Sequence, residues 1–220
     1  MLQLKLLITL IAFISVKCSG QDRETAQKLF VKTSPLFIKV GELKSTNPDS
    51  AHILNKILIQ NLERIYYSDT AFQHITDYLG DSYAFANNNE KAIYWYSKKL
   101  PEFSHQDFPI PRYECIAFAY FRLGELDSCK RYILRANAAF EKNYRGGQRD
   151  YLVALKKMVD QVFFKTDTVT IQVLKAKGIS SCKYSIDMLQ FLLPFAEEKK
   201  EYFSEAFSKK TVLTRQNNCR

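Results

Sequence analysis

TDYLGDSYAFANNNEKAIYWYSKK (residues 76–99) and YECIAFAYFRLGELDSCKRYILRA (residues 113–136) follow the same pattern of side-chain sizes. At an offset of 37 residues, as from Tyr83 to Tyr120, bulky, small, aromatic, small and bulky residues recur in the same order. A repeat period in the thirties is typical of stacked helix-turn-helix units. Each such unit needs neighbours to bury its apolar face, so the two stretches predict a helical repeat fold.

The overall composition favours helices. The 220 residues include only 7 glycines and 6 prolines, while 46% of the residues are hydrophobic and 25% are charged. These proportions are ordinary for a globular chain and argue against wholesale disorder. Scarce helix breakers make a turn-rich all-β fold improbable, and the length suits one core or one short solenoid.

The N-terminus has the features of a signal peptide. Lys5 precedes an apolar segment at residues 6–16, which is shorter than the ~20 residues that a membrane span needs. The small residues of Cys18–Gly20 suit cleavage, so residues 1–20 are predicted to be a signal peptide and Gln21 the first mature residue. An uncleaved anchor or a buried first helix is the alternative. The chain is therefore expected to be exported, to the periplasm or outside the cell.

The cysteines fit an exported protein. Cys18 could carry a lipid and so attach the chain to a membrane, but Lys17 before it departs from the usual lipobox. An oxidising compartment permits disulfides among the other four cysteines, and three pairings are open. Cys129 stands where the first repeat has Ala92, so it is expected to be a packed small residue. The four are Cys115, Cys129, Cys182 and Cys219.

The basic charge is dispersed along the chain. The formal net charge is +9, and it falls to +7 without residues 1–20, which hold two lysines and no acid. Basic doublets stand beside acids, as in the segment Glu197–Glu201. This mixture indicates solvated helix faces, so no nucleic-acid partner is expected.

The hydrophobic periodicity predicts seven to nine helices. Within the repeats, Asn87–Asn89 and Gly124 should form the turns between helices at 72–85, 89–100, 112–123 and 126–142. Flanking helices are expected at 21–45, 53–67, 150–164, 167–177 and 183–209. The apolar stripe of the first flanking helix comprises Leu29, Leu36, Val40 and Leu43.

Several local signals refine these helices. Pro35 and Pro194 should kink or divide the helices that contain them, and Asp49 or Ser50 should cap the second flanking helix. The β-branched segment at residues 169–173 could form a strand. It has no partner strand, however, so a helix that ends before Gly178 is more consistent. Ser180 or Ser181 is expected to cap the last helices.

The two repeats resemble the tetratricopeptide repeat family. Leu79, Gly80, Tyr83, Ala92 and Tyr96 match the family pattern in the first repeat, and Tyr113, Ala117, Tyr120, Gly124 and Ala136 match it in the second. The resemblance implies a right-handed α-solenoid of antiparallel helix pairs. It covers residues 73–143, between flanking helices at 21–72 and 144–220, in one continuous helical domain from 21 to 220. The first repeat departs from the family pattern at Thr76, where the pattern has a bulky residue.

The resemblance also implies a binding module. The first helix of each pair would line a concave groove for a peptide or a partner helix. Asp77 and Asp81 replace the lysine and asparagine of the variant that clamps a C-terminal carboxylate, so that ligand is excluded, and a basic or mixed segment is expected. Whether the C-terminal helices fill the groove is open. The implied partner-binding residues are His74, Asp77, Asp81, Ala84, Phe85, Glu114, Phe118, Phe121 and Arg122.

No catalytic or metal-binding motif is present. His52, His74 and His105 lie in different predicted elements, and the sequence has no HExxH, GxSxG or glycine-rich phosphate loop. The chain is therefore predicted to bind a protein or peptide in the cell envelope, with no catalysis, no cofactor and no metal. The alternatives are an immunity or inhibitor protein against a toxin, and an envelope carbohydrate or polymer binder.

Overall fold

The computed structural model of the chain describes residues 2–68, 75–98, 110–142 and 168–198. Within these ranges the protein is all-α, with eight helices packed in adjacent pairs and no strand, which confirms the predicted fold class. The chain forms two compact units, Met1–Asn88 and Asn89–Arg220. The boundary between Asn88 and Asn89 falls inside the first predicted repeat.

Parts of the prediction lie outside the described residues, among them the helix at 150–164 and the end of the last helix beyond residue 198. Among the helices that are described, none is both long and apolar enough to cross a membrane.

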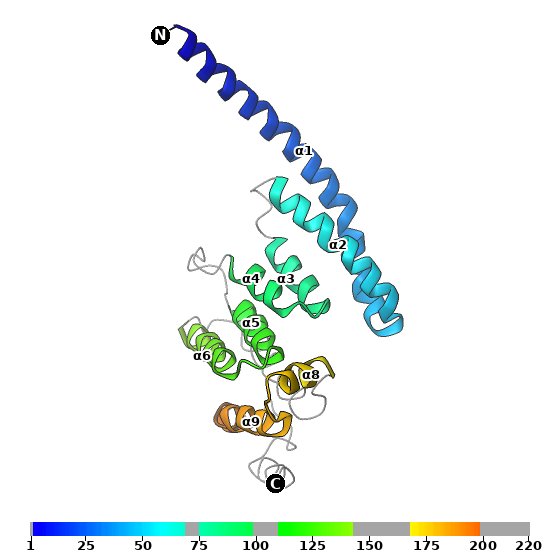
Figure 1. The fold of residues 1–220 in the computed structure, drawn as a ribbon, viewed down its shortest axis with the longest axis vertical. Helices are drawn as coiled ribbons and strands as arrows, with labels where there is room; N and C mark the ends of the chain where they lie inside the picture. Colours follow the sequence, from blue (N-terminus) through cyan, green and yellow to red (C-terminus); the bar gives the residue numbers. More distant parts are fainter. Residues whose placement is uncertain (1, 69–74, 99–109, 143–167, 199–220) are drawn as a thin grey trace. The chain divides into compact units, whose positions relative to one another are not determined.

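Unit 1 is built on a helical hairpin. Helix α1 (Leu2–Thr46) and helix α2 (Pro48–Ser68) pack side by side, and α3 (Thr76–Phe85) packs on α2 (Figure 1). The cap of α2 is Asn47, whose Oδ1 accepts a hydrogen bond of 3.1 Å from the Ser50 N–H. Pro48 then occupies the first helical position, where its missing N–H costs nothing. The predicted caps, Asp49 and Ser50, are therefore wrong.

Helix α1 is continuous through Pro35. The prediction that Pro35 could divide it is wrong, because the lost backbone bond is on the exposed side, where Val31 is 67% exposed. In the part of α1 whose burial is described, residues 23–46, the most buried positions are Ala26, Thr33 and Val40, seven residues apart. Of the predicted apolar stripe only Val40 is fully buried, while its other members are half-buried.

The interface between α2 and α3 contains buried polar groups. The Asn55 Nδ2 donates to the Ser82 carbonyl at 2.8 Å, and the Tyr83 hydroxyl donates to the Glu63 Oε1 at 2.7 Å. Burial, reinforced by the bond to the Glu63 carboxylate, raises the pKa of Tyr83 well above its ordinary value. Tyr83 is therefore a neutral donor that fixes α3 on α2.

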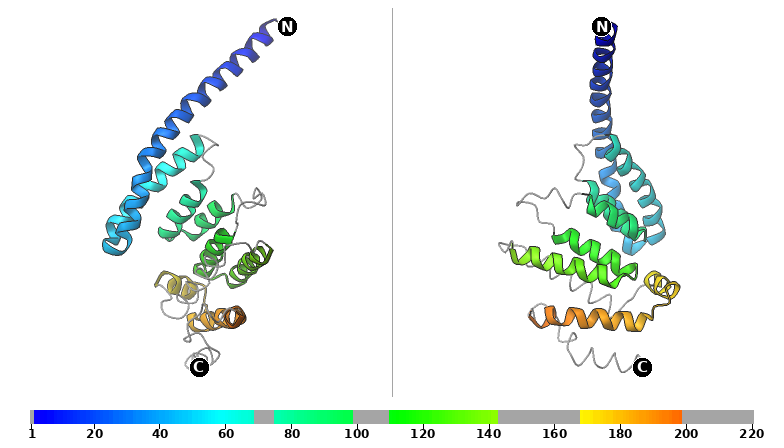
Figure 2. Two further views of the ribbon diagram at one scale, coloured as in Figure 1. Left: turned by 180° about the vertical axis from the view of Figure 1, so that it is seen from behind. Right: turned by 60° about the vertical axis from the view of Figure 1, so that its left-hand side comes forward.

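Unit 2 contains α4 (Asn89–Ser97), α5 (Ile110–Arg122), α6 (Leu126–Lys142), α8 (Thr168–Ala176) and α9 (Ser181–Glu198). Helices α4, α6 and α8 each contact α5, and α9 contacts α6 and α8 (Figure 2). The segment at 169–173 forms a helix, as predicted, and not a strand. Helix α6 also has the predicted bounds. Pro194 lies inside α9 and does not divide it.

Three turns of the chain share one backbone geometry. Asn87, Gly124 and Gly178 adopt the left-handed conformation, with φ of 60°, 72° and 67°. The N–H of the next residue bonds back to the carbonyl five positions earlier, at 2.9 Å in the first turn, 3.0 Å in the second and 2.8 Å in the third. This is the Schellman motif that ends many helices. The α8–α9 pair therefore repeats the turn of the predicted repeats, although its sequence does not match their pattern.

The described cysteines of the predicted mature chain are in two states, which the sequence left open. Cys115 and Cys129 keep their thiols, whereas Cys182 is disulfide-bonded. None of the three complete pairings is therefore formed. Cys129 is fully buried, as predicted, and this burial raises the pKa of its thiol well above the ordinary value.

Cys129 should resist alkylation in the folded protein. Alkylation requires a thiolate that the reagent can reach, and Cys129 offers neither exposure nor a low pKa. Iodoacetamide at pH 8 is expected to modify Cys115, which is half-buried, and to modify Cys129 only after denaturation. Peptide mass spectrometry measures both rates in one sample. Equal rates in the native protein would contradict the described core.

Candidate binding site

Two of the predicted partner-binding residues in unit 2 are half-buried. They are Phe118 and Arg122, which stand one helical turn apart on α5. The Arg122 guanidinium lies over the Phe118 ring, 5.7 Å from its centroid. Phe118 also packs against the core of unit 2, so the protein itself covers part of this cation–π pair.

The other two predicted residues of unit 2 are buried. Phe121 is 2% exposed, and its ring centroid lies 5.1 Å from that of Tyr184 on α9. The Tyr184 hydroxyl donates to the Phe121 carbonyl at 2.8 Å. Glu114 is 8% exposed. This corrects the expectation that both meet a partner: α9 covers the Phe121 side of α5, so the C-terminal part of the chain fills that side itself.

The predicted residues of unit 1 are spread around α3. Phe85 stacks on the His52 ring at 4.5 Å, and the Lys44 Nζ lies 4.6 Å from the Phe85 centroid. Phe85 therefore joins α3 to the hairpin, and part of its ring is covered by the protein itself. Asp81 is exposed, while Asp77 and Ala84 are half-buried. His74 lies outside the described residues.

An apolar pocket of about 200 Å³ lies between α1, α2 and α3 of unit 1, and we call it the α1 pocket. Leu58 and Leu62 of α2, both buried, line it together with Tyr78 of α3. The Tyr78 ring meets the Phe37 ring edge-on, with centroids 4.8 Å apart. Five residues of α1, at spacings of three, one, three and one, complete the lining: Phe30, Thr33, Ser34, Phe37 and Ile38.

The mouth of the α1 pocket has an apolar border. Ile38 lines the pocket and is nevertheless 64% exposed. Val31, seven residues earlier and therefore on the same side of α1, is 67% exposed. A pocket edged by exposed aliphatic side chains is a surface that a partner could cover.

Sequence reasoning did not find the α1 pocket. It followed the leucine stripe of the first helix and left out Phe30 and Phe37, which stand seven residues apart on a neighbouring face. That spacing was the available signal. Which face α3 would approach depends on tertiary packing, which periodicity within one helix does not contain.

A wider depression of about 750 Å³ lies between the α5–α6 and α8–α9 turns of unit 2. Glu125, Asp127 and Asp187 line it together with Lys183. Glu125 is also 3.8 Å from the Lys177 Nζ. The wall therefore holds three acids and one lysine, and Lys177 beside it offsets part of the excess negative charge.

Neither geometry nor comparison identifies a reaction centre. Among the described residues, no group of three or more His, Cys, Asp or Glu side chains could hold a metal ion. A scan of family models, a search of curated proteins and a search of solved structures return no match to this chain.

Proposed function

We propose that this protein is an exported α-helical repeat scaffold that binds a protein or peptide partner in the cell envelope and performs no chemistry itself. The tetratricopeptide-like pattern of its repeats supports a binding role. The three shared turns are consistent with such a scaffold, because repeat proteins build extended binding surfaces from similar units.

Two further features support export. Residues 1–20 have the composition of a signal peptide. Cys182 is disulfide-bonded, and structural disulfides persist mainly in oxidising compartments.

The observation that carries the binding proposal is the α1 pocket with its apolar border. Interfaces concentrate their energy in a few buried anchors that fill pockets, surrounded by contacts that exclude water. The α1 pocket is a recess that such an anchor could fill, and Val31 and Ile38 form apolar surface around it. Val31 and Ile38 extend the apolar surface beyond the recess, which supports a partner that covers both.

The test is affinity capture from envelope extracts with the wild-type chain and an Ile38→Asp variant. Ile38 is 64% exposed, so its replacement should leave the fold intact, whereas a carboxylate at the pocket mouth should oppose an apolar partner. We expect the variant to hold the partner about tenfold less tightly. Quantitative mass spectrometry of the captured proteins measures this.

Ile53→Asp is the matched control. Ile53 lies on α2 of the same unit and is 63% exposed, but it does not line the pocket. The control should retain the partner. If both variants lose it equally, or neither does, the pocket is not the working surface and the proposal fails.

A further inference from the structure

Three tyrosines and two arginines form one cluster on α5 and α6 of unit 2, and we call it the Tyr–Arg cluster. The Tyr132 ring centroid lies 6.1 Å from that of Tyr113 and 5.6 Å from that of Tyr120. The Arg135 guanidinium lies over the Tyr132 ring, 4.9 Å from its centroid. Arg131 is the fifth member of the cluster, because it acts on Tyr120.

Both arginines lie close enough to Tyr120 to affect its ionisation. Burial is the main reason that the pKa of Tyr120 lies above its ordinary value, and Tyr132 and Glu125 raise it further. Arg131 and Arg135 act in the opposite direction, so both guanidiniums lie near the Tyr120 hydroxyl. With its raised pKa, this hydroxyl is neutral at physiological pH and can donate a hydrogen bond.

The two arginines share the outward face of α6 with an apolar side chain. Arg131 and Arg135 are both exposed and stand one helical turn apart. Leu134 is 51% exposed, and Ala138 is exposed as well. Residues three and four positions apart on a helix are neighbours, so these four side chains form one continuous surface, which we call the α6 strip. It combines two positive charges with an exposed leucine.

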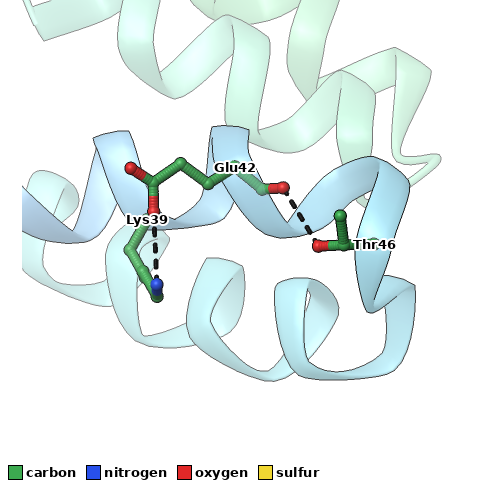
Figure 3. A network of polar contacts seen from close by, with 3 residues as sticks. All are labelled: Lys39, Glu42 and Thr46. Carbon is green, nitrogen blue, oxygen red and sulfur yellow. Dashed lines mark hydrogen bonds and ion pairs between the residues drawn. The ribbon is translucent and has the colours of Figure 1, made fainter.

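Neither arginine of the α6 strip has an acidic partner. Some other exposed cations do: on α1, the Lys39 Nζ lies 3.2 Å from the Glu42 Oε2 (Figure 3). Among the described residues, no carboxylate forms an ion pair with Arg131 or Arg135. The positive charge of the strip is therefore available to a ligand.

The nearest acids in the sequence do not neutralise the strip. Asp127 stands one turn before Arg131, and the two form no ion pair within the described chain. Glu125 lies 3.8 Å from the Lys177 Nζ, so its charge acts on another cation. Like charges one turn apart on a helix repel each other, so an anion bound between Arg131 and Arg135 would be stabilising.

The packing of Arg135 suits an oxyanion. A guanidinium that lies on an aromatic ring keeps N–H groups for another partner, and their fork matches the two oxygens of a carboxylate. The rings themselves are less available, because Tyr120 and Arg135 cover part of Tyr132. All three tyrosine rings also pack against the core of unit 2. The cluster therefore favours an acidic ligand over a sugar, which would need a free ring face.

We propose that the α6 strip binds an acidic segment of a protein, with carboxylates on Arg131 and Arg135 and an apolar side chain on Leu134. Charge complementarity carries this assignment. A protein segment is favoured over a small anion, because a small anion would leave Leu134 in water. The strip adds a second binding surface to the proposed scaffold and does not depend on the α1 pocket. Its ligand differs from the basic or mixed segment predicted from Asp77 and Asp81, which belong to unit 1.

Fluorescence anisotropy with a labelled peptide tests the α6 strip. The probe is an amphipathic peptide of Glu, Leu and Ala, and its counterpart has Gln in place of every Glu. We expect the full chain to bind the Glu peptide and Arg131→Gln/Arg135→Gln to weaken this binding about tenfold. The Gln peptide should bind much more weakly. No binding of the Glu peptide, or equal binding of the two peptides, would overturn the proposal.

Lys175→Gln/Lys183→Gln is the matched control. Both lysines are exposed in unit 2, lie outside the Tyr–Arg cluster, and change the net charge by the same amount when replaced. The control should bind the Glu peptide as the wild type does, and circular dichroism should show that both variants are folded. An equal loss in the two variants would mean that net charge, and not the α6 strip, attracts the peptide, and the proposal would fail.

Vesicles of phosphatidylglycerol distinguish a protein ligand from a membrane. Their phosphate groups are anionic, as carboxylates are, and basic surfaces can attract them. In a sedimentation assay, we expect the wild type and Arg131→Gln/Arg135→Gln to bind these vesicles equally weakly. Vesicle binding that needs both arginines, without binding of the Glu peptide, would overturn the assignment to a protein segment.

The two proposals fail separately, because Ile38→Asp tests the α1 pocket and the arginine variant tests the α6 strip. If the Glu peptide binds through the arginines while Ile38→Asp keeps every captured protein, the α1 pocket is not the working surface and the α6 strip stands. If Ile38→Asp loses a partner while the Glu peptide binds without the arginines, the proposed function stands and the α6 strip is wrong.

Discussion

Replacement of Tyr184 by alanine should lower the free energy of unfolding of unit 2 by about 3–5 kcal/mol. Tyr184 is 3% exposed, and its ring packs on Phe121 with centroids 5.1 Å apart. Its hydroxyl donates to the Phe121 carbonyl at 2.8 Å. The substitution removes the ring, leaves a cavity between α5 and α9, and leaves a buried carbonyl without this donor. Urea denaturation followed by circular dichroism measures the loss.

One further tyrosine variant separates the contribution of the Tyr184 ring from that of its hydrogen bond, and a second is a control. Tyr184→Phe keeps the ring and should cost about 0.5–1.5 kcal/mol, the net worth of one hydrogen bond. Tyr94→Ala is the matched control in the same unit, because Tyr94 is 49% exposed on α4, and it should cost less than about 1 kcal/mol. Equal losses for Tyr184→Ala and Tyr94→Ala would show that α9 does not dock on α5 as described.

Gly124→Ala should destabilise unit 2 by about 2–5 kcal/mol, more than the same change at Gly178. A non-glycine residue in the left-handed conformation costs about 1–2 kcal/mol, and both glycines have that conformation. At Gly124 an added Cβ would also lie 3.0 Å from the Leu174 Cδ2, and overpacking of a core typically costs about 1–3 kcal/mol more. The same denaturation experiment measures both variants.

Gly178→Ala is the internal reference. At Gly178 a new Cβ would meet nothing within 4 Å, so only the backbone term of about 1–2 kcal/mol should appear. The difference between the two variants isolates the contact between the α5–α6 turn and α8. If both variants lose the same stability, Leu174 moves aside without cost, and that contact is loose.

Local signals in the sequence predicted the helices and turns well. The Asn87 and Gly124 turns are where expected, and α6 spans Leu126–Lys142 as predicted. Gly178 follows α8, and Ser180 accepts a bond of 3.4 Å from the Lys183 N–H, as expected of a cap. Such features depend on a few consecutive residues, so composition and spacing suffice to predict them.

The wrong predictions concern features that depend on neighbouring residues or on the packing of other helices. Asp49 and Ser50 were reasonable caps, but Asn47 precedes Pro48, and proline favours the first helical position. Phe121 was placed on an open surface because family positions assume an uncovered first helix. Only the packing of α9, which brings Tyr184 from 63 residues away, decides that Phe121 is buried.

The candidate site was predictable only in part. Phe118 and Arg122 are half-buried, and Phe118 packs against the core of unit 2, so their predicted role in partner binding stays a prediction. The α1 pocket requires α1, α2 and α3 together, and one of its lining residues, Thr33, is polar at a buried position. A hydrophobicity pattern assigns such a residue to the outside, so its burial could not be read from the sequence.

The contact between Tyr184 and Phe121 also has a consequence for the order in which unit 2 folds. Helices joined by tight turns meet through residues that are close in sequence, whereas this contact joins residues 63 positions apart. Closing longer loops costs more entropy, so we expect the helical hairpins to form first and α9 to dock late. Until α9 docks, the Phe121 face of the folding chain stays open to water. We therefore expect chaperone binding or self-association at that stage of folding.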